Sequence, residues 1–327
     1  MSPQRLTAPK LLRACALAAV ACAVALAVFP LDVEASRYCQ AHAPYLTLGL
    51  FAVGLLALLA RQRSVMLGAF AGSALLSVVL RSSTINVAPE STLVEAIPAR
   101  SFEMLQVSTA NLNDNVAAGL AAIQRAAPDL VSVQGLTPDW AEYLAEELDG
   151  AYPHQYTFED IGLQGIGLYS STPLGSVDSV VVGGIVHVDA CYAGDAGLEE
   201  LRLLAVQTLP PVNAFAYHSL RRQLAVVAEQ VRAAELPTVV FGDFNSVPWS
   251  DEFYDFQRDA ELLDSRRTYQ STFVKGSPQF FETPVEHIFY SPDLRCVGYQ
   301  SLRAEGTYFG NGATFQDRSA GVELAAL

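Results

Sequence analysis

The chain has 327 residues, of which 51% are hydrophobic, and its formal net charge is −14. From position 83 onward the sequence holds 13 basic and 32 acidic residues, so this part alone carries −19. A surface this acidic repels phosphate backbones and gains nothing from counterion release, which makes a nucleic-acid partner unlikely on physical grounds. The same charge argues against docking on anionic lipid headgroups.

The first eighty residues contain three apolar runs, at 11–31, 43–60 and 64–80. A helix needs about 20 residues, with about 17 as the lower limit, to cross the hydrocarbon core, so three membrane spans fit. The runs lack a polar face, which argues against a soluble hairpin. We therefore predict a membrane anchor over 1–82, a linker over 83–101 and a separate domain over 102–327.

A cleaved signal peptide competes for the first run, because Arg5, Lys10 and Arg13 come first and Val33 to Ser36 resembles a cleavage site. The length of the run and the two runs that follow favour an uncleaved span. Basic residues near the N-terminus and at Arg61 and Arg63 then predict a cytoplasmic N-terminus. The C-terminal domain of this multi-pass protein of the plasma (inner) membrane would be periplasmic.

Apolar periodicity divides the rest of the chain into strands and helices. Strands are expected at 102–110, 129–134, 166–169, 177–187, 201–208, 239–241, 285–290, 295–302 and 320–324, and helices at 116–127, 138–148, 217–234 and 250–257. Strands outnumber helices and short turns join many of them. This pattern predicts an α/β (α+β) sandwich of two mixed sheets flanked by helices. Cys191 and Cys296 could form a disulfide in a periplasmic domain, but spacing does not show that they meet.

The stretch from Pro237 to Pro248 contains a buried strand that ends in a polar tip, Gly-Asp-Phe-Asn. Asp243 and Asn245 alternate with Phe244, so strand geometry aims both polar side chains one way and Phe244 into the core. An acid beside an amide suits a site that orients a water and holds an oxyanion. The alternative is an Asp/Asn turn whose side chains bond their own backbone.

Several ordered motifs resemble the endonuclease/exonuclease/phosphatase superfamily of metal-dependent phosphoesterases, in particular its membrane-anchored bacterial branch. The motifs are Thr109 to Leu112, Pro128 to Gly135, Leu203 to Pro211, Gly242 to Asn245, Val285 to Ser291 and Gln316 to Arg318. The resemblance covers roughly residues 103 to 327. It implies a four-layer sandwich with the site at one edge of the two sheets.

Four positions keep the residue that the resemblance implies. Asn111 matches an asparagine that helps to hold the metal, and Asp243 and Asn245 match the pair that orients the attacking water. Asp317 matches a late aspartate that partners a histidine in the family. His287, directly after Glu286, matches the histidine of the family's late Asp-His strand.

Four other positions depart from the family pattern. Gly135 replaces the metal-binding glutamate, Gln207 a phosphate-contacting histidine, Glu286 an aspartate and Arg318 the terminal histidine. Magnesium is usually held through one or two carboxylates, so glycine at 135 removes the main ligand. Gln207 can donate a hydrogen bond to phosphate but can neither take up a proton nor carry a charge, and the Arg318 guanidinium binds phosphate without acting as a general acid or base. Arg318 would pair with Asp317 or Asp243.

These departures favour a membrane-tethered pseudoenzyme that binds no metal and serves as a binding or accessory subunit with protein partners. The alternative is an active phosphoesterase for small phosphodiesters or phosphomonoesters. It would hold Mg²⁺ or Mn²⁺ through Asn111, Glu286 and Asp243 and bind phosphate through Gln207 and Arg318. A third reading, a three-span protein unrelated to this family, requires the ordered motifs to be chance.

Overall fold

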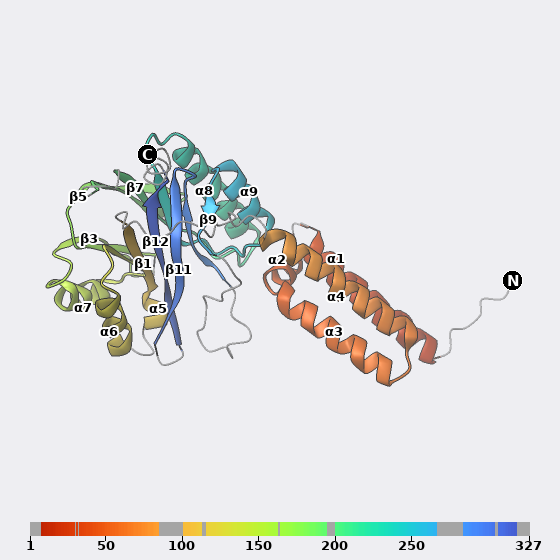
Figure 1. The fold of residues 1–327 in the computed structure, drawn as a ribbon. Coiled ribbons are helices and arrows are strands. Elements are labelled where there is room, and N and C mark those ends of the chain that lie inside the picture. The colour runs from red at the N-terminus through yellow and green to blue at the C-terminus, as the bar shows by residue number, and fades with distance from the viewer. Residues whose placement is uncertain are drawn as a thin grey trace, which may run out of the picture. The chain divides into compact units, whose positions relative to one another are not determined.

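The computed structural model describes residues 8–29, 31, 33–84, 101–112, 116–162, 164–194, 200–266, 284–304 and 307–318. The chain forms two compact units (Figure 1). One consists mainly of helices from the first 85 residues, and the other contains most of the chain from residue 86 onward.

The N-terminal unit contains four helices, α1 (Ala8–Val28), α2 (Glu34–Ala41), α3 (Ala43–Leu59) and α4 (Arg63–Thr84). By length and composition, α1 and α4 could each cross a membrane. Helices α2 and α3 meet at a bend of 79° and are long and apolar enough to cross a membrane as a pair, whereas α3 alone has 17 residues, the lower limit for a span. Pro44, in the first turn of α3, suits this position because it has no N–H to donate. The described helices thus supply two spans, or three if the bent pair counts as one, and the expected three spans remain a prediction.

The second unit contains two six-stranded sheets. The first has the order β11-β12-β1-β2-β4-β3 and the second β5-β6-β7-β8-β10-β9. The first consists of β1 (Phe102–Ser108), β2 (Leu130–Gln134), β3 (His154–Phe158), β4 (Ile166–Ser170), β11 (Leu294–Ala304) and β12 (Thr307–Asp317). The second consists of β5 (Leu174–Val182), β6 (Ile185–Tyr192), β7 (Leu201–Gln207), β8 (Thr238–Asp243), β9 (Leu263–Asp264) and β10 (Glu286–Tyr290). Both are mixed, because β1 runs parallel to β2 and β7 to β8 while the other pairs are antiparallel.

Strand alternation sorts the apolar side chains into layers. Phe102 and Met104 of β1 meet Val239 and Phe241 of β8 between the sheets. The outer face of the first sheet packs on α6 (Val116–Ala126) and α7 (Pro138–Leu148), and that of the second on α8 (Ala214–Arg232) and α9 (Asp251–Asp259). The predicted sandwich of two mixed sheets flanked by helices is therefore confirmed.

The observed strands differ in part from those expected. The strand expected over 177–187 is a hairpin of β5 and β6, which turns at Gly183 and Gly184 with φ of 61° and 86°. Two consecutive left-handed residues match the twist of a tight hairpin. Strands β3 and β12 were not predicted, and the strand expected at 320–324 lies outside the described residues. The glycines of β12 lower its strand propensity, which hid the strand from a reading of the sequence. Gly310 is nevertheless needed, because a Cβ at this position would lie 2.1 Å from the Gln106 carbonyl oxygen.

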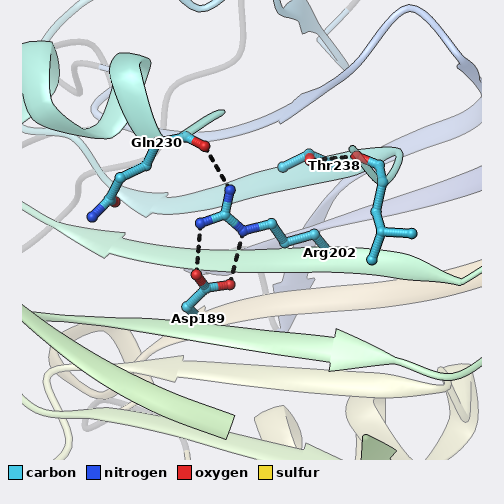
Figure 2. Close-up of polar contacts among 5 residues, drawn as sticks. Asp189, Arg202, Gln230 and Thr238 are labelled. Carbon is cyan, nitrogen blue, oxygen red and sulfur yellow. Dashed lines mark hydrogen bonds and ion pairs between the residues drawn. The ribbon is translucent and has the colours of Figure 1, made fainter. Parts of the chain in front are cut away.

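Arg202 on β7 joins two strands to the last turn of α8 (Figure 2). Its Nε and Nη2 donate to the two carboxylate oxygens of Asp189 on β6 at 2.9 and 2.6 Å. Its Nη1 donates to the Gln230 carbonyl oxygen at 2.6 Å. The Arg202 and Asp189 side chains are 18% and 28% exposed, so water screens the pair only in part. The negative end of the helix dipole adds to the attraction.

Replacing Arg202 by alanine is expected to lower the free energy of unfolding by about 2–3 kcal/mol, because Asp189 and a helix-end carbonyl lose a charged donor. Arg202→Lys should recover only part of the loss, since an ammonium does not reproduce the two-pronged contact. Urea unfolding of the full chain measures both. Arg258→Ala, which removes exposed ion pairs, is the control and should change little. Equal effects at the two positions would contradict this role of Arg202.

Candidate functional site

The space between the sheets changes from apolar to polar at one end, where β1, β2, β7 and β8 finish. On β1 the inward-facing residues run Phe102, Met104 and then Gln106. On β8 they run Val239, Phe241 and then Asp243. Because strand side chains alternate, each polar residue continues the inward face of its strand. We call this end of the sandwich the polar end.

The first sheet contributes a row of buried amides and hydroxyls. Asn311 on β12, Gln106 on β1 and Ser132 on β2 are neighbours in register, and Gln134 lies one inward position further along β2. All four are at most 2% exposed. Among the described residues, the side-chain amides of Gln106 and Gln134 and the Ser132 hydroxyl find no hydrogen-bond partner. Buried polar groups are normally satisfied, so this row is suited to contact a polar ligand or ordered water.

The second sheet places Gln207, Asp243 and Glu286 side by side, because β7, β8 and β10 are neighbours in that order. Strand β10 packs on β12 of the other sheet. There the Tyr308 hydroxyl donates to Glu286 Oε2 at 2.5 Å and links the two sheets. Tyr308 is fully buried, and the sequence analysis did not single it out.

The two carboxyls of the polar end hold protons unusually well. Burial, followed by the charge of Asp243, raises the pKa of Glu286 to about 8, although the hydrogen bond from Tyr308 lowers it. Burial also raises the pKa of Asp243 to about 6, opposed by hydrogen bonds from Asn245. A desolvated carboxyl beside a second one favours its neutral form. Near neutral pH, Glu286 therefore stays largely protonated in the folded chain.

Asp243 and Asn245 form a turn as well as a site. The Asn245 backbone N–H donates to Asp243 Oδ1 at 3.0 Å, and its side-chain amide donates to the Thr208 carbonyl oxygen at 2.9 Å. Asn245 has a φ of 47°, a left-handed conformation that asparagine tolerates better than most residues. Phe244 is buried among α8, α9 and β10, as the alternation predicts. Asn245 thus positions Asp243 against the end of β7.

His287 lies on the opposite face of β10 from Glu286. It is fully buried, and its ring contacts Phe253 and Phe244 at centroid distances of 4.6 and 5.7 Å. Its Nε2 lies 2.7 Å from the Ser246 carbonyl oxygen and so donates to it. Burial holds the pKa of His287 well below its usual value. The structure therefore places the expected His287 beside Glu286 along β10 but turns its ring toward α9, away from the polar space between the sheets.

Asn111 and Gly135 both lie at the polar end. Asn111 belongs to the short helix α5 (Thr109–Leu112), which follows β1 directly, and is 6% exposed. Gly135 follows β2 and has a φ of 76°, and its carbonyl oxygen accepts the Thr109 hydroxyl at 2.7 Å. The position left without a carboxylate therefore also has a backbone conformation that favours glycine.

Asp317 and Arg318 lie at the other end of the sandwich, which corrects their expected place. Strand β12 runs antiparallel to β1, with Gly310 opposite Val107 and Phe315 opposite Phe102. Asp317 lies two residues beyond Phe315, away from the polar end. Arg318 donates from its backbone to the Asp293 carbonyl and from Nη1 to the Pro292 carbonyl at 3.0 and 2.9 Å. The expected pairing of Arg318 with Asp243 or Asp317 is replaced by these contacts, and Tyr308 occupies the polar end of the strand.

Comparisons with known proteins agree with this architecture. The model of the Endonuclease/Exonuclease/phosphatase family matches residues 108–317. The endonuclease/exonuclease/phosphatase from Beutenbergia cavernae DSM 12333 is 18% identical with a TM-score of 0.55, over 67% of this chain and 72% of that chain. ANGEL2, a 2′,3′-cyclic phosphatase in complex with adenosine-2′,3′-vanadate, is 16% identical with a TM-score of 0.53, over 68% and 97%. TDP2 of D. rerio, complexed with a single-strand DNA product, is 15% identical with a TM-score of 0.51, over 66% and 99%. A search of the curated proteins finds no match.

Proposed function

Because the chain belongs to the endonuclease/exonuclease/phosphatase family, we propose that it is a membrane-anchored member that no longer hydrolyses phosphoesters and acts as a binding or accessory subunit of a membrane assembly. The observation that carries this proposal is Gly135, which follows β2 at the polar end with a φ of 76° and offers no carboxylate where the family resemblance implies a metal-binding glutamate. Glu286, which lies beside Asp243, accepts the Tyr308 hydroxyl.

Family members usually use divalent metals, so the fit of the polar end to such an ion bears on the proposal. Asp243, Glu286 and Asn111 are the residues that would hold it, and the ion would act as a Lewis acid on a phosphoryl oxygen. Mg²⁺ prefers ionised carboxylates in near-octahedral geometry. A glycine at 135 fits this requirement poorly because it supplies no carboxylate, and no cluster of three or more His, Cys, Asp or Glu suited to a metal occurs in the described part of the chain.

The alternative function is an active phosphoesterase with a rearranged site. It is favoured by the convergence of Asp243, Glu286 and Tyr308 at one end of the sandwich. A cation bound to Glu286 would stabilise the ionised carboxylate and so lower its pKa. It would also replace the hydrogen bond that the Tyr308 hydroxyl donates to Glu286. Arg318 takes no part in this alternative, because it lies at the other end.

Calorimetry with Mg²⁺ and Mn²⁺ on the full chain in phosphatidylcholine nanodiscs separates the two functions. The same samples are assayed for hydrolysis of p-nitrophenyl phosphate and bis-p-nitrophenyl phosphate. The Asp243→Asn, Glu286→Gln double variant sets the background. We expect neither ion binding nor hydrolysis above that background. Ion binding and metal-dependent hydrolysis that both disappear in the double variant would overturn the proposed loss of activity.

We further propose that α1, the bent α2–α3 pair and α4 span the plasma membrane, with the N-terminus cytoplasmic and the β-rich unit periplasmic. The apolar length of α1, of α4 and of the α2–α3 pair supports three spans, and the basic residues near the N-terminus and at Arg61 and Arg63 support this orientation. The β-rich unit would then meet its protein partners outside the cytoplasm.

A further inference from the structure

A pocket with aromatic walls lies on the outer surface of the β-rich unit. Val116 at the start of α6 and Asp139, Trp140 and Tyr143 of α7 line it, and its volume is about 370 Å³. Helices α6 and α7 cover the outer face of the first sheet (Figure 1). That sheet therefore separates the pocket, which we call the α7 pocket, from the inward carboxyls of the polar end.

The two rings of the α7 pocket stand on a fixed backbone. Trp140 and Tyr143 are one helical turn apart, and their rings meet edge to face with centroids 5.8 Å apart and an interplanar angle of 79°. Trp140 and Val116 pack against the core beneath the helices, whereas Tyr143 is 38% exposed. The Thr137 hydroxyl accepts from the Trp140 backbone N–H at 3.4 Å and caps α7. One ring is thus anchored in the core and the other is open to solvent.

Acidic side chains surround the rings. Helix α7 contains four acids and no lysine or arginine, and the acids are Asp139, Glu142, Glu146 and Glu147. Positions 139, 146 and 147 lie one turn from Tyr143. None of the four acids forms an ion pair with a residue that the structure describes. The basic residue of α6, Arg125, lies nine residues from Val116, about 13 Å along that helix. The negative charge at the pocket is therefore not neutralised within this part of the chain.

Aromatic rings beside a carboxylate suit an organic cation. The face of an aromatic ring attracts a cation, by about 0.5–1 kcal/mol at an exposed site. A guanidinium is planar and weakly hydrated, so it stacks on such a face, and its paired N–H groups match the two oxygens of a carboxylate. A metal ion would instead need several oxygen ligands and would gain little from the apolar wall. Arginine is thus the side chain whose chemistry the pocket matches.

We propose that the α7 pocket binds an arginine side chain from a basic segment of a protein partner. The guanidinium stacks on the exposed ring of Tyr143 and donates to the Asp139 carboxylate. The charge of −19 that the chain carries from position 83 onward steers a basic segment toward this unit. That the arginine belongs to a protein partner rests on the accessory function proposed above, whereas the binding of a guanidinium does not.

Binding of an arginine peptide to the full chain tests the proposal. The probe is a dye-labelled peptide with three arginines among glycines and serines, and fluorescence anisotropy gives its Kd. The chain is kept in dodecyl maltoside, an uncharged detergent, at 0.15 M salt, where charges are screened beyond about 8 Å. A second peptide with citrulline at the three positions keeps the shape and loses the charge. We expect it to bind about tenfold more weakly or less, because neither the cation–π contact nor the ion pair forms.

Two variants examine the walls of the pocket. Tyr143→Leu removes an aromatic face but keeps an apolar side chain at an exposed position, and Asp139→Asn removes the carboxylate of the pocket. Each should raise the Kd of the arginine peptide about threefold. The control is Glu235→Gln, which removes the same charge from an exposed position in the loop between α8 and β8. It should leave the Kd nearly unchanged.

Equal weakening by Asp139→Asn and Glu235→Gln would overturn the site, since the peptide would then follow the acidic surface as a whole. Equal affinity for the citrulline peptide would overturn the guanidinium and assign the pocket to an uncharged segment. The absence of saturable binding would overturn both. The measurement involves neither Mg²⁺ nor hydrolysis, so its failure leaves the proposed loss of activity intact. Metal-dependent hydrolysis, in turn, would overturn that loss without changing the affinity for the peptide.

Discussion

Replacing Glu286 by glutamine will abolish most of the fall in stability that the native chain shows between pH 6.5 and pH 8. Burial and the neighbouring Asp243 raise the pKa of Glu286 from 4.5 to about 8 in the folded state. Folded Glu286 thus binds its proton more tightly than the unfolded chain does. Its contribution to stability is complete below pH 4.5 and is lost as the pH rises toward 8. At 1.36 kcal/mol for each pH unit, the loss over this interval is about 2 kcal/mol.

Above pH 6.5, the change of stability with pH can be assigned to Glu286, because the groups that change stability in the opposite direction titrate at lower pH. Burial lowers the pKa of His187 from 6.5 to about 4, so its contribution is present above pH 6.5 and is lost as the pH falls toward 4. The buried His287 acts in the same direction. Asp243, with a pKa of about 6, has completed most of its change below the interval. Between pH 4.5 and 6.5 these effects partly offset one another, and above 6.5 Glu286 dominates.

Urea unfolding of the full chain at pH 6.5, 7.2 and 8 measures the slope, with Glu146→Gln on the exposed face of α7 as the control. The native chain and the control should lose stability together, and Glu286→Gln should lie nearly flat. An unchanged slope in Glu286→Gln would refute the assignment. If Mg²⁺ flattened the slope of the native chain, an ion would be ionising the site, against the function proposed for it.

The layers of the sandwich could be predicted because alternation fixes which side chains face inward. Phe244 turned toward the helices and Asp243 toward the other sheet, as period-two geometry requires. The same alternation places Gln106 and Gln134 inward. Sequence alone cannot separate a buried amide from one on a solvated face, because both follow the same period, and the row they form was missed.

The misplacement of Asp317 and Arg318 has a different origin. The motif near residue 317 was matched by residue type, whereas register decides which end of a strand lies at the site. Gly310 and Gly312 interrupt the apolar alternation of β12. The sequence therefore did not predict a strand here, and it gave no reason to place Tyr308 at the polar end. The bond between Tyr308 and Glu286 joins residues 22 apart on opposite sheets, a contact that local periodicity does not contain.

Restoring the glutamate expected at position 135 is predicted to fail as a repair. With φ at 76°, a side chain longer than hydrogen there costs about 1–2 kcal/mol, because its Cβ crowds the following carbonyl oxygen. Gly135→Glu should therefore lower the free energy of unfolding by that amount and should not confer Mg²⁺ binding. Gly135→Asp should be milder, since aspartate visits the left-handed region more readily. Urea unfolding and calorimetry of the full chain measure the two properties.

Gly150→Glu is the matched control, because a Cβ at Gly150 meets nothing within 4 Å and its backbone is not left-handed. It should be nearly neutral, which separates the backbone cost at 135 from the general effect of adding a charge to an acidic domain. If Gly135→Glu is as stable as Gly150→Glu and binds Mg²⁺, the backbone at 135 relaxes at little cost. The missing carboxylate at position 135 would then suffice to explain why the site binds no ion. The protonation of Glu286 would in that case result from the absence of the ion and would not be its cause.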